Sequence, residues 1–371
     1  MTAEASEGIT YASAGVDTHA GDRAVELMKD AVARTHGPEV LGGVGAFAGL
    51  FDASALKEYD RPLLASSTDG VGTKIVIARR LGIHDTIGQD LVAMVVDDIV
   101  VCGAKPLVMT DYIACGRVVP ERIADIVRGI AVGCEMAGTA LVGGETAEHP
   151  GVMEPDDYDV AGAAIGVVEA SALLGPDRVR AGDVVVALAS SGLHSNGYSL
   201  VRRVVAHAGW SLDTHLDELG RTVGEELLEP TRIYAKLCVS LAAAVPGLHA
   251  LSHVTGGGLA ANVARVVPRG LAATVDRAAW DLPAVFPLVQ AAGSVPWNDL
   301  EATLNLGVGM VALVAPDDAD ALIAQSAAAG VPAWVLGAVV EDDGRMAGGD
   351  VVRGAKGVDG GAVYLSGAYR A

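Results

Sequence analysis

The chain has 371 residues, of which 51% are hydrophobic and 47 are glycine, and its formal net charge is -20 at pH 7. This length predicts about two domains, and the hydrophobic content excludes an intrinsically disordered chain. The negative charge argues against nucleic acid or an anionic membrane as a partner, because both would be repelled, whereas a small anion could still bind with local help from glycine loops, lysine or a cation.

Neither a membrane span nor secretion is indicated. Mean hydropathy is +0.39, but charged residues and prolines interrupt the apolar stretches before they reach the roughly 20 residues that a span needs. Residues 1–20 show no basic start followed by an apolar stretch, so no secretory signal is visible. The four cysteines fit no metal spacing or disulfide framework, and we expect reduced thiols in the cytoplasm.

A helix is predicted over residues 22–35, and a glycine-dense loop, GGVGAFAG at residues 42–49, follows it. Gly43, Gly45 and Ala48 can be aligned with a dinucleotide-binding fingerprint. That motif requires a strand directly before it, and none is evident here, so a Rossmann site is not favoured.

The next segment, STDGVGTK at residues 67–74, ends a β-prone run. Asp69 can coordinate a hard cation, and Gly70 and Gly72 let backbone N–H groups approach an anion closely. Lys74 can neutralise phosphate charge. The spacing is not that of a Walker A loop, and the alternative is an ordinary Asp-Gly turn with a surface lysine.

An apolar helix is predicted over residues 88–103, and it carries Asp90, Asp97 and Asp98. A buried carboxylate needs a cation or hydrogen-bond donors, so we expect at least one of these acids to face a metal or a pocket. The alternative for Asp97 is a place on the solvent side.

Further along, a strand over residues 106–114 and a helix over 121–137 precede a short strand, 140–142. This strand runs into GGETAEHPG, residues 143–151, where Glu145, Thr146 and Glu148 suit a metal or polar ligand, with a surface turn as the alternative. A strand over 160–169 and a loop over 174–183 end the first domain. The second begins with a strand over 184–189.

That strand leads into SSGLHSNGYSLVRRVV, residues 190–205, where Ser195 or Asn196 is predicted as the N-cap of a helix whose free N–H groups can take a phosphate. His194 could bind substrate or transfer protons, although a lone histidine is more often structural. The same arrangement recurs in SHVTGGGL at residues 252–259, before a predicted helix over 260–267. A third glycine pair, Gly307 and Gly309, follows Asn305.

These strings, together with DLVAMVVDDIVVCGAKP, DYDVAGAAIGVVE, LLEPTRIY and NLGVGM, occur in the order and spacing of the aminoimidazole ribonucleotide synthetases, also called phosphoribosylformylglycinamidine cyclo-ligases. The chain resembles this family over nearly its whole length. It departs from the family pattern at Leu304, His149 and Asp97, where Phe, Met and Asn are expected, and in the glycine-rich tail after Asp342.

The resemblance implies a two-domain α/β (α+β) fold: residues 1–175 for ATP binding and dimerisation, 176–342 for an α/β domain at the substrate site, and 343–371 as a tail without an assigned role. It also implies a homodimer with a shared β-barrel and ATP near that interface. The implied reaction converts formylglycinamidine ribonucleotide and ATP to aminoimidazole ribonucleotide, ADP and phosphate. A small-molecule kinase of the same superfamily and a non-catalytic nucleotide-binding protein are the alternatives.

Site residues follow from the same resemblance. Asp69, Asp98 and Glu145 are expected to bind Mg²⁺, and Lys74 and His194 to act in catalysis. Nucleotide binding is expected from the segments around STDGVGTK and the first glycine loop, namely Gly42, Gly43, Gly45, Asp69, Gly70, Gly72, Thr73 and Lys74. The ribonucleotide is expected to contact two loops of the second domain, namely His194, Ser195, Asn196 and Gly197, and Thr255, Gly256, Gly257 and Gly258.

Overall fold

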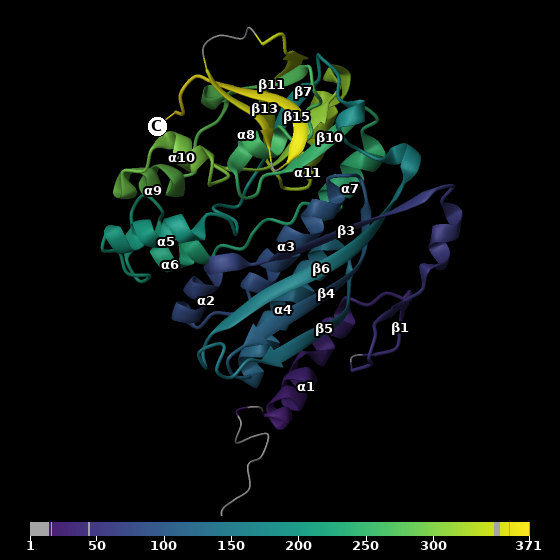
Figure 1. Ribbon diagram of the computed structural model, residues 1–371, viewed down its shortest axis with the longest axis vertical. Helices are drawn as coiled ribbons and strands as arrows, with labels where there is room; N and C mark the ends of the chain where they lie inside the picture. The colour runs from purple at the N-terminus through teal and green to yellow at the C-terminus, as the bar shows by residue number, and fades with distance from the viewer. Residues whose placement is uncertain (1–14, 16, 44, 345–348, 356, 371) are drawn as a thin grey trace, which may run out of the picture.

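The computed structural model describes residues 15, 17–43, 45–344, 349–355 and 357–370, which form two packed α/β domains (Figure 1). The N-terminal domain occupies the lower half of the view and ends with β6. The C-terminal domain begins with β7 and occupies the upper half. Within the described residues, no helix is long and apolar enough to cross a membrane.

The N-terminal domain is built on a four-stranded sheet of order β3-β6-β4-β5. β6 pairs antiparallel with β3 and β4, and β4 pairs parallel with β5. The strands are β3 (Pro62–Gly70), β4 (Lys105–Cys115), β5 (Ala140–Glu148) and β6 (Tyr158–Glu169). The short elements of this domain are β1 (Val40–Leu41), β2 (Leu50–Phe51), η2 (Ala53–Glu58) and η3 (Gly72–Lys74).

Helices cover one face of this sheet. They are α1 (Thr18–Arg34), α2 (Ile75–Leu81), α3 (Ile87–Val100) and α4 (Pro120–Ala137). α3 is apolar on almost every side because it lies between the sheet, α4 and the C-terminal domain. Gly88 permits the close approach of α3 to α4, since a Cβ there would collide with the backbone of residues 126–130. α4 begins with Pro120 and ends at Gly138, whose φ of 75° closes the helix.

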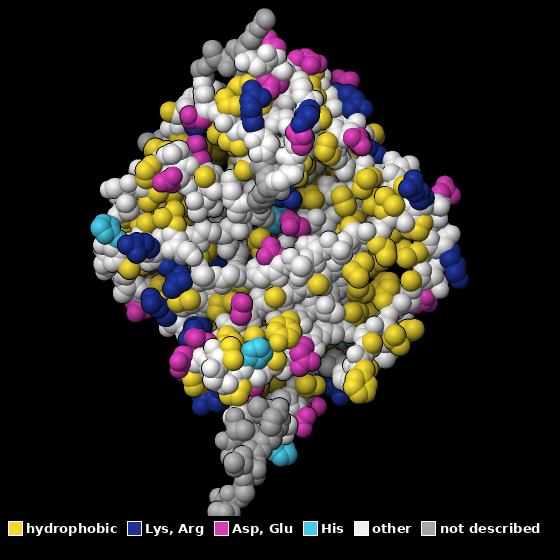
Figure 2. Space-filling model, in the orientation of Figure 1, with side chains coloured by type: hydrophobic (Ala, Val, Ile, Leu, Met, Phe, Trp, Pro, Cys, Tyr) yellow, Lys and Arg dark blue, Asp and Glu magenta, His cyan; other side chains and the backbone are white. Residues whose placement is uncertain are grey.

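The opposite face of the sheet carries exposed apolar side chains. Leu64 on β3 is 65% exposed, Tyr112 on β4 is 42% exposed and Ile165 on β6 is 41% exposed. We call this surface the open face. Hydrophobic side chains gather on the right-hand half of Figure 2, over the region where Figure 1 shows β3 and β1. A sheet face of this kind usually packs against another apolar layer.

The C-terminal domain contains a seven-stranded sheet of order β10-β12-β7-β13-β11-β15-β14. Its strands are β7 (Val184–Ala189), β10 (Leu248–His253), β11 (Leu271–Asp276), β12 (Val308–Val314), β13 (Ala333–Glu341), β14 (Asp350–Ala355) and β15 (Val358–Ser366). β12 is buried along its whole length, because other parts of the domain cover both of its faces. The short strands β8 (His215–Leu216) and β9 (Arg221–Thr222) pair separately.

The helices of this domain are α5 (Tyr198–His207), α6 (Val223–Leu228), α7 (Ala235–Ala244), α8 (Gly258–Val263), α9 (Val285–Gly293), α10 (Trp297–Glu301) and α11 (Ala319–Ala328). The tail, which the sequence left without a role, supplies β14 and β15. β15 pairs parallel with β11, so the described part of this segment belongs to the C-terminal sheet. The expected strand over 184–189 is confirmed as β7. The short strand expected over 140–142 is wrong in length, because β5 continues through the glycines to Glu148.

Candidate active site

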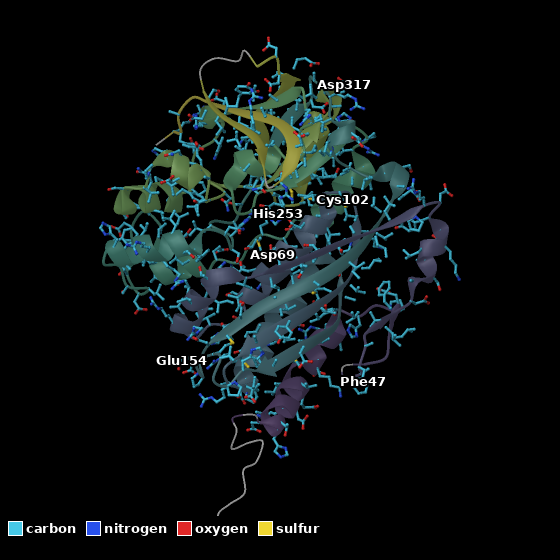
Figure 3. The ribbon with its side chains drawn as sticks, in the orientation of Figure 1. Phe47, Asp69, Cys102, Glu154, His253 and Asp317 are labelled. Carbon is cyan, nitrogen blue, oxygen red and sulfur yellow. The ribbon has the colours of Figure 1, made fainter. Side chains whose placement is uncertain are left out.

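The segment STDGVGTK lies where the two domains meet. β3 ends at Gly70, and the chain turns through η3 into α2, so that Gly72 (φ 72°) and Thr73 face the start of α5. The Thr73 Oγ1 atom lies 3.4 Å from Ser199 Oγ. Figure 3 places Asp69 at this junction, close to His253 of the C-terminal domain. The expected metal ligand and the second histidine loop are therefore neighbours.

The two glycine loops of the C-terminal domain are also brought together. Ser195 Oγ donates to the carbonyl oxygen of Val71 at 2.6 Å, which joins its loop to the STDGVGTK segment. A Cβ on Gly256 would lie 3.4 Å from Asn196 Oδ1. The N-terminal ends of α5 and α8 thus share one region.

The predicted N-cap of α5 is wrong. Gly197 occupies the cap position with φ 76°, and no side chain caps the helix. A side chain at Gly197 would collide with Leu304, so glycine is required by packing as well as by the left-handed backbone. Ser195 and Asn196 instead contact the N-terminal domain, Asn196 through Met94 Sδ at 3.5 Å.

The loop before α8 is fixed by Asn262, which is fully buried. Its amide nitrogen donates to the carbonyl oxygens of Thr255 at 3.2 Å and Gly258 at 2.7 Å. Gly257 and Gly258 have φ values of 101° and 72°, which side chains rarely adopt. This loop is therefore held in shape by side-chain contacts rather than by a long helix, since α8 has only six residues.

His253 ends β10 and contacts Asp98 at the C-terminal half of α3. Its Nδ1 atom lies 2.9 Å from Asp98 Oδ1, and its Nε2 atom has no hydrogen-bond partner among the described residues. Burial lowers the pKa of His253, but the hydrogen bond to Asp98 and the charges of Asp97, Asp98 and Asp69 outweigh it and raise the pKa above its ordinary value. The site thus contains a histidine whose pKa is raised by three neighbouring carboxylates.

His194 differs from His253 in its charge state. It is 2% exposed, and burial together with the charges of His253 and Lys74 lowers its pKa well below the ordinary value. Nε2 accepts from the backbone N–H of Ser191 at 3.1 Å, so the ring proton resides on Nδ1. Nδ1 has no partner among the described residues. His194 is therefore a neutral donor.

Lys74 does not lie where a phosphate could reach it. The side chain is fully buried, and Nζ donates to Asp90 Oδ1 at 2.8 Å and to the carbonyl oxygens of His194 at 3.1 Å and Glu229 at 2.5 Å. An ammonium group has three protons, and all three have partners here. The expected contact between Lys74 and the transferring phosphoryl group does not fit this geometry.

Asp97 is fully buried, so the solvent-side alternative is wrong. Its two oxygens accept from the backbone N–H of Tyr234 at 3.0 and 3.1 Å. Burial raises its pKa to about 7, although the charge of His253 partly opposes this effect. The folded protein therefore retains a proton between the ordinary pKa of 3.8 and about 7 that the unfolded chain releases.

This proton predicts a pH effect on stability. The stabilisation is complete below the unfolded pKa and is lost as pH rises through about 7. We expect Asp97→Asn to match the wild type near pH 4 and to be more stable at pH 8 by on the order of 4 kcal/mol. Urea unfolding between pH 4 and 8 checks this. Parallel stability curves for the two proteins would contradict it.

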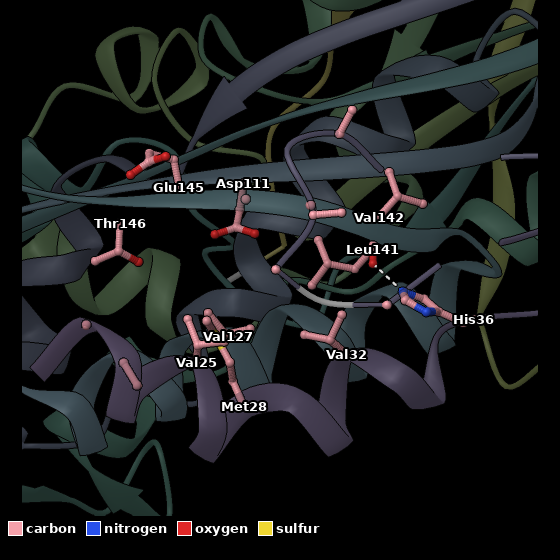
Figure 4. A pocket seen from close by; sticks show the side chains of 18 residues that line it. Val25, Met28, Val32, His36, Asp111, Val127, Leu141, Val142, Glu145 and Thr146 are labelled. Carbon is pink, nitrogen blue, oxygen red and sulfur yellow. Dashed lines mark hydrogen bonds between the residues drawn. The ribbon is translucent and has the colours of Figure 1, made fainter. Parts of the chain in front are cut away.

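A cavity of about 310 Å³ lies between α1, the first glycine loop and β5 (Figure 4). Apolar residues of α1, including Ala24, Val25 and Met28, form one wall, and Gly43 and Gly45 form part of another. Gly42, Gly43 and Gly45 have open space where a side chain would begin. Gly43 and Gly45 of the glycine loop therefore border a pocket.

Asp111 and Glu145 both line this cavity, but they differ in environment. In Figure 4, the side chain of Asp111 points into the space between β5 and α1, and the side chain of Glu145 points away from that space. Burial raises the pKa of Asp111 to about 7. Within the described parts of the chain, no three His, Cys, Asp or Glu side chains are grouped closely enough to hold a metal. The structure thus separates Glu145 from Asp69 and Asp98.

Sequence reasoning missed two residues of the site. His253 was noted only as a repeat of the His194 pattern, yet its Nδ1 atom contacts Asp98, one of the expected metal ligands. Asp111 lies in a segment read only as a strand. The signal that could have found it is an acid in the apolar run PLVMTDYIA, since strand acids need a polar environment.

Two family models match the chain. The model for the N-terminal domain of AIR synthase related proteins matches residues 51–168, and the model for their C-terminal domain matches residues 180–348. Phosphoribosylformylglycinamidine cyclo-ligase from Desulfitobacterium hafniense (strain DSM 10664 / DCB-2) is 51% identical over 332 residues, covering 90% of this chain and 97% of the relative. The protein of that name from Geobacillus kaustophilus is 50% identical over 341 residues, covering 91% and 98%.

Solved structures with lower identity share the fold. Thiamine-monophosphate kinase from Stenotrophomonas maltophilia K279a matches with a TM-score of 0.66 and 20% identity, over 93% of this chain and 97% of that one. Hydrogenase maturation protein HypE in complex with ATP matches with a TM-score of 0.63 and 17% identity, over 95% and 96%. The expected two-domain α/β fold of this superfamily is confirmed.

Proposed function

Because this chain belongs to the phosphoribosylformylglycinamidine cyclo-ligase family, we propose that it closes the imidazole ring of aminoimidazole ribonucleotide from formylglycinamidine ribonucleotide, using ATP and releasing ADP and phosphate. The observation that carries the proposal is the identity of about one half over almost the whole length of named cyclo-ligases. The reaction class is an ATP-dependent ligation that forms a C–N bond.

The chemistry requires activation of an amide. Its oxygen is a poor leaving group, so attack by the neighbouring amidine nitrogen would stall. Transfer of the γ-phosphoryl group of ATP to that oxygen gives an iminophosphate, whose carbon the nitrogen then attacks while phosphate departs. The protein supplies position and charge stabilisation for these steps, with little covalent chemistry of its own.

We assign the nucleotide to the cavity beside the first glycine loop. Its apolar wall from α1 suits a base, and Asp111 and Thr146 provide polar atoms. One row of paired residues leads from this cavity to the β3 turn: Glu145 lies opposite Tyr112, Tyr112 opposite Ala161, and Ala161 opposite Gly70. Three strand spacings amount to about 14 Å, so a nucleotide in the cavity lies about that far from Gly70 and the turn that follows β3.

Asp69 and Asp98 would hold Mg²⁺. This ion usually takes one or two carboxylates and completes its coordination with water and substrate phosphates, so two acids suffice. The charges of both acids raise the pKa of His253, which places them near one imidazole. Bound Mg²⁺ would neutralise charge on the transferring phosphoryl group. Glu145 lies at the cavity and would therefore contact the nucleotide instead of the metal.

The two histidines would contact the reacting groups. His253 in its cationic form presents an Nε2–H donor without a partner among the described residues, which suits an anionic oxygen. His194 presents a neutral Nδ1–H donor to the ribonucleotide. Asn196 and Gly256 lie where the two glycine loops of the C-terminal domain meet, and both would contact the same substrate. Hydrogen-bond donors that are already in place before the reaction stabilise developing negative charge, because the protein does not have to rearrange around it.

We also propose that two copies pair through the open face. Its exposed apolar side chains on three adjacent strands would then form the inside of a closed barrel. The small-molecule ribonucleotide and this second copy are the partners that the proposal requires.

Incubation of the purified protein with formylglycinamidine ribonucleotide and Mg-ATP tests the function. Aminoimidazole product, scored by its diazo colour, should appear together with equal amounts of ADP and phosphate. ADP release without the aminoimidazole would favour a small-molecule kinase. If neither ADP nor the aminoimidazole forms, the chain is a nucleotide-binding protein that lacks this activity.

Filling the cavity tests the nucleotide assignment. Val25 lines the cavity and is 37% exposed, so Val25→Trp can occupy the space without disturbing the core. We expect the Kd for Mg-ATP, measured by calorimetry, to rise roughly tenfold or more, because the indole and the base compete for one volume. Val152→Trp, at an exposed position outside the cavity, is the control. Unchanged ATP affinity in Val25→Trp would refute the assignment.

A further inference from the structure

A buried ion pair of the N-terminal domain, Lys74 and Asp90, is hydrogen-bonded to the C-terminal domain at the junction of the two. Lys74 and Asp90 are both completely inaccessible, and their side chains meet at 2.8 Å. Burial lowers the pKa of Lys74, and the charge of Asp90 opposes that effect. A buried pair of this kind adds little to stability relative to apolar residues. Its role is therefore to orient the groups that it contacts.

Asp90 and Asp97 act as two anchors on one face of α3. They are seven residues apart, close to two helical turns, and both accept backbone N–H groups from the segment 229–234 of the C-terminal domain. Asp90 Oδ1 accepts from Thr231 N at 2.8 Å and from Thr231 Oγ1 at 2.5 Å. Asp97 accepts from Tyr234 N. Segment 229–234 is therefore fixed to the N-terminal domain.

The same segment is bonded to the loop that carries His194. Ser191 Oγ donates to the carbonyl oxygen of Pro230 at 2.7 Å and accepts from Arg232 N at 3.1 Å. Ser191 N in turn donates to His194 Nε2. His194 has a left-handed backbone with φ 61°, which is strained for a residue with a side chain. Packing is also tight, since a side chain at Gly309 would collide with His194 and Tyr234.

Lys74 closes this network from the other side. Its ammonium donates to the carbonyl oxygens of both His194 and Glu229, so one cation binds the strained residue and segment 229–234 at once. We propose that Lys74 is a positioning residue for the substrate loop: with Asp90, it sets the backbone of His194 and so aims the Nδ1–H donor and the Ser195–Gly197 turn. It contacts neither ATP nor the ribonucleotide.

Kinetics and hydrogen exchange test this inference, which rests on the proposed function for its kinetic part. Lys74→Met keeps the length of the side chain and removes its donors. We expect kcat/KM for the ribonucleotide to fall roughly 100-fold, as for a small misplacement of a binding group, while the Kd for Mg-ATP stays unchanged. Backbone amides of residues 191–198 should exchange faster with solvent than in the wild type. Lys57→Met, at an exposed lysine, should show neither effect.

Thr231→Val provides a milder test if Lys74→Met does not fold. It removes one donor to Asp90 and should lower kcat/KM for the ribonucleotide roughly tenfold, with the same pattern in exchange. Loss of ATP affinity equal to the loss for the ribonucleotide, or unchanged exchange in residues 191–198, would overturn the proposal. If the wild-type protein does not catalyse the cyclisation, the proposed function is refuted instead. The comparison of hydrogen exchange needs no turnover and would still decide the role of Lys74.

Discussion

Asp98→Asn is expected to reduce turnover roughly 100-fold to 1,000-fold, the range seen when one charge-stabilising group is removed from an active site. The fold should persist, because the side chain of Asp98 is 38% exposed and an amide oxygen can still accept from His253 Nδ1. What is lost is the negative charge, which balances Mg²⁺ and favours the cationic form of His253. Steady-state assays across a range of Mg²⁺ concentrations measure the effect.

Asp320→Asn is the matched control, since Asp320 is an exposed acid on α11 in the C-terminal domain. The variant at Asp98 should require more Mg²⁺ for half-maximal rate, and the control should not. Wild-type turnover in Asp98→Asn would remove this residue from the reaction. Reduced turnover with an unchanged Mg²⁺ requirement would contradict its assignment as a metal ligand.

Ile165→Arg is expected to convert a dimer into a monomer. Ile165 lies on the open face, where a partner copy would bury it, and a buried guanidinium without a partner is strongly unfavourable. Replacement of a central apolar contact should weaken association roughly 30-fold or more. Sedimentation at micromolar concentration should give a mass near 37.6 kDa for the variant and twice that mass for the wild type.

Val335→Arg tests whether any exposed arginine on a strand has this effect. Val335 is 47% exposed on β13 of the other sheet, away from the open face. It should leave the dimer intact. A wild-type protein that sediments as an active monomer would refute the assembly and leave the apolar face unexplained.

The elements that position the site could be predicted from the sequence because their signals are local. The apolar run that forms α3, the strand that becomes β7 and the glycines that close the loops before α5 and α8 all depend on neighbours within a few residues. The polar residues at strand ends were also visible. The family resemblance then gave each segment an expected role, and the fold and the family are confirmed by the comparisons.

The direction of individual side chains was decided only by the tertiary structure. A lysine after a glycine-rich loop looks exposed in sequence, yet Lys74 is buried because its acceptors lie 16, 120 and 155 residues away. The neutral state of His194 and the cationic tendency of His253 depend on burial and on carboxylates from another domain. Glu145 was grouped with Asp69 and Asp98 by the family resemblance, but sheet pairing places it on β5, at the cavity beside α1.

The tail shows the same division. Its glycines and short apolar runs carry no strong periodic signal, so the sequence left its role open. β15 is formed by parallel pairing with β11, a strand more than eighty residues earlier, and that edge exists only once the C-terminal sheet has assembled. The sequence by itself determined which segments become strands, helices and glycine turns, because those choices depend on local backbone preference. Long-range packing determined which side chains are buried, charged or free to meet a ligand.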